Sequence, residues 1–168
     1  MTLKEFNNLP ENEVLKQFSI CCGASKWTEQ MINSCPFQNK NELLKMAEET
    51  WFSLSGQDWL EAFSHHPKIG NIRSLQSKFQ KTAKLSESEQ KSISHVSEDI
   101  LKEIAKGNQL YEKKFGYIFI VCATGKTAEE MLALLNERLK NDPEAELLIA
   151  AKEQNKITRL RLEKLLDL

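Results

Sequence analysis

The sequence predicts an all-α fold, a single compact domain over residues 1–168 with about seven to eight helices and one short buried extended segment. Three observations lead to this prediction. Apolar residues recur at steps of three and four along most of the chain. Capping patterns, prolines and glycines punctuate these runs at helix-like intervals. Only residues 117–125, YIFIVCATG, have a strand-like composition. One strand has no partner for its backbone, so we expect this run to be buried extended chain.

In the N-terminal half, the sequence predicts four short helices. We place them over Glu11–Ser19, over a segment capped by Ser25 that holds Trp27 and Met31, over Leu43–Leu54, and over Trp59–Phe63. Proline and glycine supply the boundaries, because proline suits a first helical position and both residues end helices. These boundaries are Pro10, Gly23, Cys35–Pro36, Ser55–Gly56 and His66–Pro67.

In the C-terminal half, the sequence predicts three longer helices, which follow a polar connector over about Asn71–Leu85. Two Ser/Thr-x-x-Glu capping boxes, Ser86–Glu89 and Thr127–Glu130, each open a helix. The first of these helices is expected to kink near Gly107–Asn108 and to end at Gly116. The last helix begins at Asp142–Pro143 and runs nearly to Leu168.

Composition and charge exclude several classes of function. The net charge of −1 does not indicate nucleic acid or an anionic membrane as a partner. The four cysteines lack zinc-ligand spacing, which favours reduced thiols in a cytoplasmic protein. We find no secretory signal, no apolar run that would cross a bilayer, and no peroxisomal tripeptide at Leu166–Leu168. No metal site is expected either, since only His95 joins the pair His65 and His66.

The segment FSHHPKIG contains the first candidate for chemistry. His66 precedes a proline, which disfavours helical backbone and fixes the place where the helix must stop. An imidazole on such a rigid stop suits acid–base catalysis. A surface-loop histidine or a helix C-cap cation remains open, and His65 is the weaker candidate. For Glu89 the alternatives are a capping-box carboxylate and a functional acid near a helix N-terminus.

Arg161 stands out in the last helix because we expect it on an inward stripe. The residues of that stripe are Ala150, Gln154, Ile157, Arg161, Leu165 and Leu168. Arg159 is expected to face water and to pair with Glu163. A buried guanidinium needs a partner, which is either a core carboxylate or the anionic group of a ligand.

Four segments in order resemble one family, the OHCU decarboxylases, whose substrate is 2-oxo-4-hydroxy-4-carboxy-5-ureidoimidazoline. They are HHPKIG, LSESEQ, YEKKFGYIFIVCATGK and NDPEAELLIAAKEQNKITRLRLEKLL, and the resemblance runs from the first helix to the last. It implies an all-helical, cofactor-free enzyme of urate breakdown, usually a homodimer, which forms (S)-allantoin.

The resemblance also implies roles for particular residues. It assigns catalysis to His66, Glu89 and Arg161, with Glu89 either ionised and paired with His66 or acting as the protonated acid. Positions of the substrate pocket fall on Pro67, Ser86, Gln90, Phe119, Ile120, Val121 and Cys122. The alternative functions are a non-catalytic helical module that binds ureides and a helical interaction protein with incidental histidines.

Overall fold

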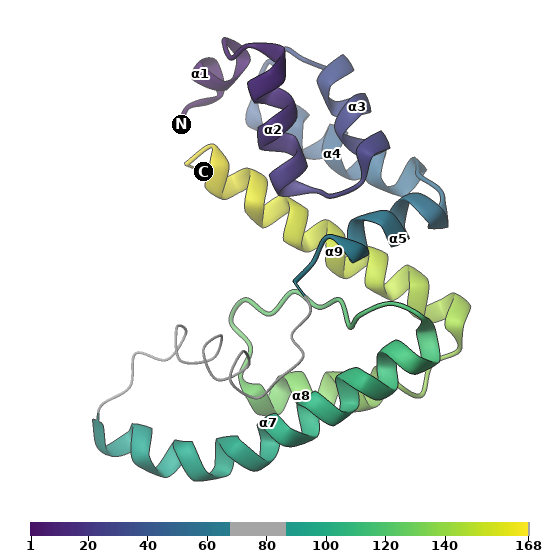
Figure 1. Cartoon of the computed structure of the whole chain (residues 1–168). Helices are drawn as coiled ribbons and strands as arrows, with labels where there is room; N and C mark the ends of the chain where they lie inside the picture. The colour runs from purple at the N-terminus through teal and green to yellow at the C-terminus, as the bar shows by residue number, and fades with distance from the viewer. Residues whose placement is uncertain (68–86, 168) are drawn as a thin grey trace. The chain divides into compact units, whose positions relative to one another are not determined.

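The computed structural model describes residues 1–67 and 87–167, with the backbone alone over 87–97. Eight helices and no strand are found within these ranges, so the all-α prediction is confirmed. The chain divides into two compact units, Met1–His66 with Leu147–Leu168, and Pro67–Glu146 (Figure 1). Each unit is described by itself, and a single domain over residues 1–168 stays a prediction.

The first unit is built from short helices and most of the last helix. Its helices are α1 (Leu3–Asn7), α2 (Glu11–Cys21), α3 (Ser25–Asn33), α4 (Lys40–Ser53), α5 (Gly56–Ser64) and, from Leu147 onward, α9 (Pro143–Leu165). Helix α3 contacts α2, α4 and α5. All four helices predicted in this half are therefore present, and α1 is an additional helix capped by Thr2.

One predicted helix cap in this half is wrong. Ser25 does not cap α3, because Ala24 occupies the N-cap and the Ser25 hydroxyl donates to Glu61 Oε1 at 2.6 Å. Helix α4 ends at Ser53, just before Ser55–Gly56 as predicted. Ser55 in addition caps α5, since its hydroxyl accepts from the Asp58 amide in a complete capping box. Serine signals a helix start from sequence, but the exact cap depends on which amides its hydroxyl can reach.

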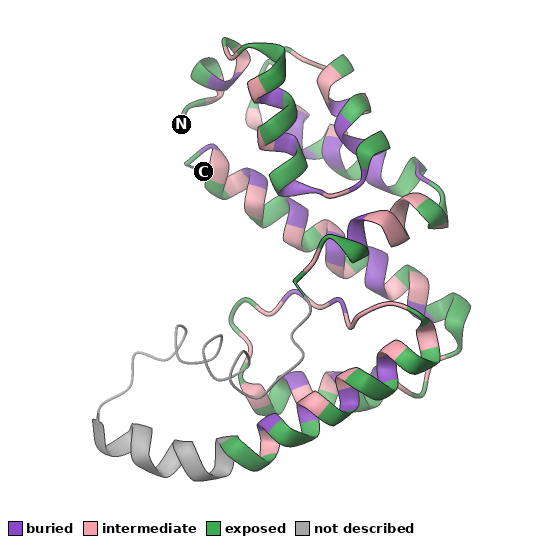
Figure 2. Cartoon of the chain, in the orientation of Figure 1, coloured by how far each residue is buried: buried purple, intermediate pink, exposed green. Residues whose placement is uncertain are grey.

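The core of the first unit is aromatic. The Phe18 ring lies 5.1 Å from that of Phe6 and 5.7 Å from that of Trp27, centroid to centroid. Two buried indoles also tie helices together, since Trp27 Nε1 donates to Ala47 O at 2.9 Å and Trp51 Nε1 donates to Ala151 O at 2.8 Å. The second of these bonds joins α4 to α9, which carries the candidate arginine. Figure 2 shows buried residues along the inner faces of these helices.

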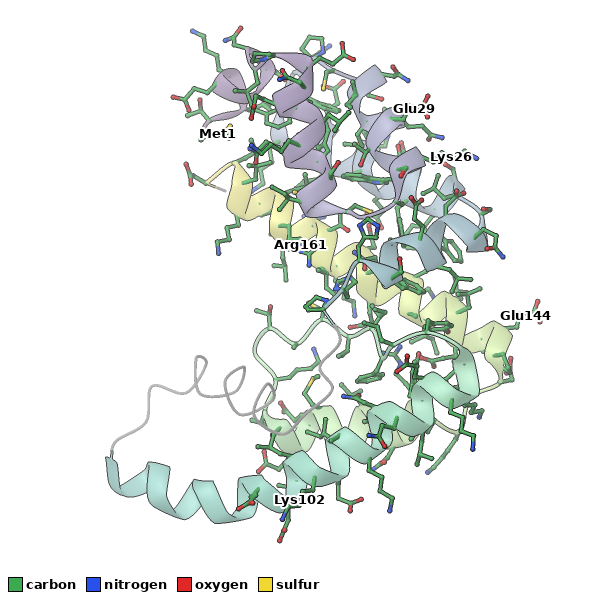
Figure 3. The ribbon with its side chains drawn as sticks, viewed as in Figure 1. Met1, Lys26, Glu29, Lys102, Glu144 and Arg161 are labelled. Carbon is green, nitrogen blue, oxygen red and sulfur yellow. The ribbon has the colours of Figure 1, made fainter. Side chains whose placement is uncertain are left out.

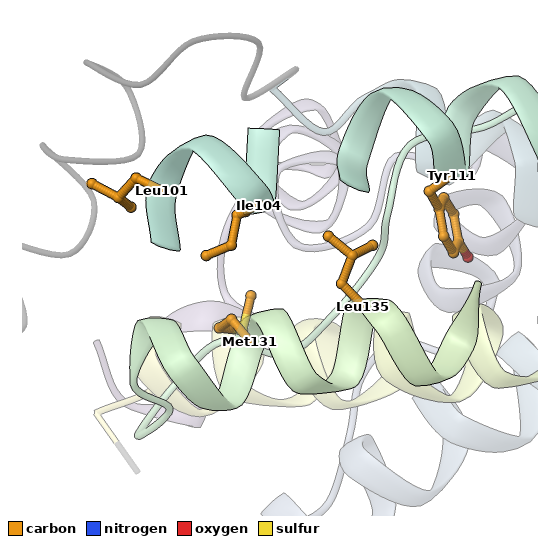
Figure 4. Packing of buried hydrophobic residues seen from close by; sticks show 5 residues of the cluster. All are labelled: Leu101, Ile104, Tyr111, Met131 and Leu135. Atoms are coloured by element: carbon orange, nitrogen blue, oxygen red, sulfur yellow. The ribbon is translucent and has the colours of Figure 1, made fainter. Parts of the chain in front are cut away.

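The second unit contains α7 (Glu87–Phe115) and α8 (Ala128–Arg138), which pack side by side. Their shared core holds Leu101, Ile104, Tyr111, Met131 and Leu135 (Figure 4). Helix α7 continues through Gly107 and Asn108 without interruption, where a kink was expected. A Cβ on Gly107 would lie 2.6 Å from Leu135 Cδ2, so this glycine allows α8 to approach closely.

Three other boundaries follow the sequence. Gly116 closes α7 with φ of +82°, a conformation that glycine adopts without steric cost. Thr127 and Glu130 form the predicted capping box of α8, and α9 begins at Pro143. The capping box expected at Ser86 lies outside the described residues. No helix in the described part of the chain has both the length and the apolar composition needed to cross a bilayer.

Candidate functional site

His66 lies directly after the C-terminus of α5. The His66 backbone N–H donates to Phe63 O at 3.2 Å, and the Phe63 side chain is fully buried. The C-cap position belongs to His65, not to His66. His65 packs so closely on Gly23 that a Cβ there would lie 2.6 Å from His65 Cβ. The backbone at the histidine pair is therefore fixed from the side of α5 and from the α2–α3 turn.

The His66 imidazole contacts a buried amide. Its Nε2 forms a short hydrogen bond with Oε1 of Gln154 on α9. Gln154 is 0% exposed, and its Nε2 donates to Thr158 Oγ1 at 3.2 Å. The half-buried imidazole thus has one face toward a polar chain that runs through the core of the first unit.

Arg161 lies on α9, beside the C-terminal end of α2 (Figure 3). Its side chain is half-buried, and its Nη1 donates to the carbonyls of Ile20 at 3.2 Å and Cys21 at 3.1 Å. These carbonyls belong to the last turn of α2, where the helix dipole is negative. Among the described residues, the partner of the guanidinium is therefore a helix end and not a core carboxylate, and the side chain is not fully buried.

This arrangement occupies one donor nitrogen of Arg161 and leaves two others. Among the described residues, Nε and Nη2 have no hydrogen-bond partner, while Nη1 is held by the α2 carbonyls. A guanidinium anchored on one nitrogen can still present two N–H groups to an anion. Its neighbour behaves as predicted: Arg159 is exposed and donates from Nε to Glu163 at 3.2 Å.

Gln154, Thr158 and Arg161 share one face of α9, at steps of four and three. They span about 10 Å along the helix axis. The sequence prediction included Gln154 on the inward stripe but gave it no role. A polar residue at a core position is the signal that identifies it, because a buried amide requires partners.

Two adjacent thiols lie beside this face. Burial raises the pKa of Cys21 to about 11, although the Arg161 charge lowers it. Burial likewise raises the pKa of Cys22 to about 11, against hydrogen bonds from the Ala24 backbone and the Thr158 hydroxyl. Both thiols are therefore protonated near neutral pH and are poor nucleophiles. None of the four cysteines forms a disulfide.

The predicted extended segment lies in the second unit and is irregular chain, not a strand. Ile120 and Cys122 are buried, whereas Phe119 and Val121 are half-buried. Arg138 Nη1 donates to Ile120 O at 2.7 Å, and Lys126 Nζ donates to Cys122 O at 2.9 Å. The carbonyls of two predicted pocket positions, Ile120 and Cys122, therefore already accept hydrogen bonds from side chains of the same unit.

A buried ion pair supports this segment, and sequence reasoning missed it. Arg138 Nε donates to Glu146 Oε1 at 2.7 Å, and the Tyr111 hydroxyl forms a short hydrogen bond with the same oxygen. Glu146 is 0% exposed, and the guanidinium lies 4.6 Å from the centroid of the Phe119 ring. Burial, then the hydrogen bond to Glu146, raise the pKa of Tyr111, which therefore acts as a donor.

The remaining predicted site residues are placed as follows. Pro67 is exposed at the start of the second unit. Glu89 and Gln90 lie in the first turns of α7, where the structure describes the backbone alone, and Ser86 lies outside the described residues. Within the described part of the chain, no cluster of three or more His, Cys, Asp or Glu side chains has a metal-binding arrangement.

Comparison with known proteins gives consistent matches. The chain is 47% identical over 153 residues to the uric acid degradation bifunctional protein TTL of Arabidopsis thaliana, covering 89% of this chain and 46% of that protein. It is 26% identical over 169 residues to the uric acid degradation bifunctional protein of Bacillus sp. (strain TB-90), covering 98% and 32%. The chain thus spans less than half the length of these curated relatives.

Solved structures and a family model agree with these relatives. A crystal structure of OHCU decarboxylase in the presence of (S)-allantoin matches with a TM-score of 0.72 and 45% identity, covering 90% of this chain and 97% of that one. An (S)-allantoin synthase, 19% identical, shares the fold with a TM-score of 0.69 over 98% of this chain and 54% of that one. The family model described as OHCU decarboxylase matches residues 7–163. The chain therefore belongs to the OHCU decarboxylase family.

Proposed function

We propose that this chain is a cofactor-independent carboxy-lyase of urate degradation. Its reaction is the decarboxylation of 2-oxo-4-hydroxy-4-carboxy-5-ureidoimidazoline to (S)-allantoin. One observation carries the proposal: the 45% identity, over 90% of the chain, to an OHCU decarboxylase crystallised in the presence of (S)-allantoin. The polar groups at His66 and Arg161 give that similarity a chemical basis.

The chemistry of the substrate explains why few groups are needed. Its carboxylate sits on a carbon next to a ring C=N bond. When the bond to the carboxylate breaks, carbon dioxide leaves and the electron pair moves toward the imine nitrogen, as in a β-keto acid. A proton then arrives at the carbon that bears the ureido group, and the face it approaches sets the configuration. The imine of the substrate takes up the electron pair, so no cofactor is needed for that task. The enzyme must position the substrate, neutralise its negative charge and deliver a proton to the carbon that bears the ureido group.

Two residues of the first unit suit these tasks. We assign Arg161 to the anionic oxygens of the substrate, since its Nη1 anchor on the α2 carbonyls orients the remaining donors. We assign His66 to proton transfer, because imidazole exchanges protons near neutral pH and this ring is held by Gln154. General acid–base catalysis by such a group contributes roughly 10²- to 10⁴-fold.

The other site residues are proposed from the family resemblance. Glu89 is the second acid–base group, with either an ionised or a protonated carboxyl. The proposed substrate contacts are Pro67, Ser86, Gln90, Phe119, Ile120, Val121 and Cys122. Two further features come from the same source, a homodimer and a cytoplasmic location, and thiols without disulfide bonds fit a reducing compartment. Sedimentation equilibrium would test the homodimer against the 19.3 kDa monomer.

Circular dichroism of the product tests the proposed reaction. Urate oxidase and the hydrolase that follows it would generate the substrate in the cuvette, and the protein would then be added. We expect rapid growth of the (S)-allantoin signal. The variants His66→Ala and Arg161→Ala should lose at least 10²-fold in rate, because each removes a group used in the reaction.

Arg159→Ala is the matched control for the arginine. Arg159 lies on the same helix, is exposed and pairs with Glu163, so its loss should leave the rate unchanged. Far-ultraviolet spectra would establish that each variant is folded. A wild-type rate equal to the spontaneous decay, with racemic product, would refute the enzyme assignment. Thermal stabilisation by allantoin without turnover would then indicate a ureide-binding module.

A further inference from the structure

The amide of Gln154 is the group in the first unit that meets the His66 ring from the core. We propose that Gln154 is a positioning residue, which holds neutral His66 in the tautomer with its proton on Nε2 and so leaves Nδ1 to exchange protons in the reaction. The assignment of a catalytic consequence rests on the proposed function. The assignment of the tautomer does not.

The two ends of the Gln154 side chain have different partners. Its Nε2 donates to Thr158 Oγ1 at 3.2 Å, so Oε1 is the atom that meets His66. An amide oxygen can only accept a hydrogen bond. The imidazole nitrogen opposite it, Nε2, must therefore be the donor. A neutral ring has one N–H, and the lone pair then lies on Nδ1.

The surroundings of Thr158 are compatible with this direction. The Thr158 oxygen accepts from the Gln154 amide at 3.2 Å, and the Thr158 side chain also lowers the pKa of the Cys22 thiol. A hydroxyl can accept from the amide and still turn its own hydrogen toward another acceptor. Donation then runs one way, from His66 through Gln154 to Thr158. If the Gln154 amide were reversed, its N–H groups would point toward the His66 ring. The ring would then need the opposite tautomer, with its proton on Nδ1.

Burial makes this direction costly to change. Gln154 is 0% exposed and Thr158 is 2% exposed, so neither side chain can exchange its partner for water. An unsatisfied buried polar group costs more than a typical hydrogen bond contributes. The amide is also uncharged, so it selects a tautomer without placing a negative charge beside the ring. Gln154 therefore differs from a carboxylate partner, which would favour the protonated imidazolium.

Nitrogen NMR of the histidine side chains tests the tautomer directly. Long-range ¹H–¹⁵N correlation spectra would be recorded well above the titration midpoint measured in the same sample, with His66 assigned by comparison with His66→Asn. We expect the pattern of the Nε2–H tautomer in the wild type. Gln154→Met keeps the length of the side chain and removes the acceptor, so the pattern should shift toward a mixture. Turnover should fall roughly 10- to 100-fold.

Two further variants sharpen the test. Gln154→Glu restores an acceptor oxygen and should restore the Nε2–H pattern. Thr158→Val removes the acceptor that orients the amide, so the share of the Nε2–H tautomer should fall in this variant. It provides an independent test if Gln154→Met does not fold. Asn155→Leu is the matched control, since this half-buried amide is next along α9 and is not part of the chain of donors. It should keep both the tautomer and the rate.

The proposal is overturned if the wild type shows the Nδ1–H tautomer. It is also overturned if both Gln154→Met and Thr158→Val keep the wild-type pattern and rate, because the amide would then only fill space. A wild type without turnover would refute the proposed reaction, and the tautomer comparison alone would then decide the role of Gln154.

Discussion

At the scale of single residues, the candidate histidine is positioned by its neighbours more than by its own sequence context. Pro67 restricts its backbone, Phe63 accepts its N–H, and Gly23 provides the space in which His65 lies. The sequence marked Gly23 only as the end of a helix. Its second role depends on a residue 42 positions later in the chain, and no local pattern contains that information.

Gly23→Ala tests the importance of this close approach. The added methyl group would lie 2.6 Å from His65 Cβ and Cγ, so the histidine pair must shift away from the α2–α3 turn. We expect a loss of about 1–3 kcal/mol in unfolding free energy from overpacking, and a fall in turnover of roughly 10-fold or more. Urea denaturation and the allantoin assay would measure these effects.

Gly56→Ala is the control for this substitution. The added methyl group there would meet only Leu147 Cδ2, at 3.4 Å, and the position is helical. Alanine favours the helix over glycine by up to about 1 kcal/mol, so stability should hold or rise. If Gly23→Ala retained wild-type stability and rate, the contact with His65 would have no part in positioning His66.

Arg161 shows where sequence periodicity stops being informative. Apolar residues follow two neighbouring stripes of α9. The predicted stripe is buried at Ala150 and Gln154 but only half-buried at Ile157, Arg161 and Leu165. Beyond Gln154 the fully buried stripe runs through Thr158, Leu162 and Leu166. Both stripes are apolar, and only the packing of the other helices determines which of them is covered.

At the scale of elements, the extended segment after α7 was predicted, but the groups that hold it were not. A lone extended chain has no neighbouring strand, so its buried carbonyls need side-chain donors. Arg138 and Lys126 supply them for Ile120 and Cys122. Arg138 lies in the last turn of α8, where an arginine ordinarily indicates a solvated helix end. Its burial depends on Glu146, which starts another helix.

Breaking the buried ion pair of Arg138 and Glu146 should strongly lower the unfolding free energy. Arg138→Met leaves the carboxylate of Glu146 without its charged partner and removes the donor to Ile120 O. We expect a loss of about 3–5 kcal/mol in unfolding free energy, measured by urea denaturation. Lys102→Met, which removes an exposed partner of Glu98 in the same unit, should cost at most about 1 kcal/mol.

The double variant Arg138→Met with Glu146→Leu separates two explanations of that loss. If the uncompensated carboxylate causes most of it, removing both charges should recover part of the stability. If the bond to Ile120 O dominates, the double variant should be no more stable than the single one. A cost for Arg138→Met as small as that of Lys102→Met would mean that the pair does not support the segment.

At the scale of the whole molecule, the sequence predicted the all-α class, the helices over the described ranges except α1, and the start of the last helix. These predictions succeed because capping boxes and apolar periodicity are local. The polar interior was largely missed, since Gln154, Glu146 and Arg138 belong to networks between distant segments. Polar burial depends on tertiary partners, and a sequence pattern does not pair them.

Two buried thiols make the stability of the molecule depend on pH in the alkaline range. Burial raises the pKa of Cys21 and Cys22 from 9.0 to about 11. The unfolded chain therefore loses these protons at lower pH than the folded one. The stabilisation is complete below pH 9.0 and declines as pH rises toward about 11. Within that window each thiol lowers the unfolding free energy by about 1.4 kcal/mol per pH unit.

Urea denaturation at a series of pH values would test this dependence against Cys22→Ala. The variant should be less stable at neutral pH, because a buried side chain is truncated, but its free energy should fall less steeply above pH 9.0. The raised pKa of Tyr111 adds the same trend in both proteins from about pH 10 upward, so the difference between the curves isolates the thiol. Parallel curves across the window would mean that Cys22 ionises equally easily in the folded and unfolded chain.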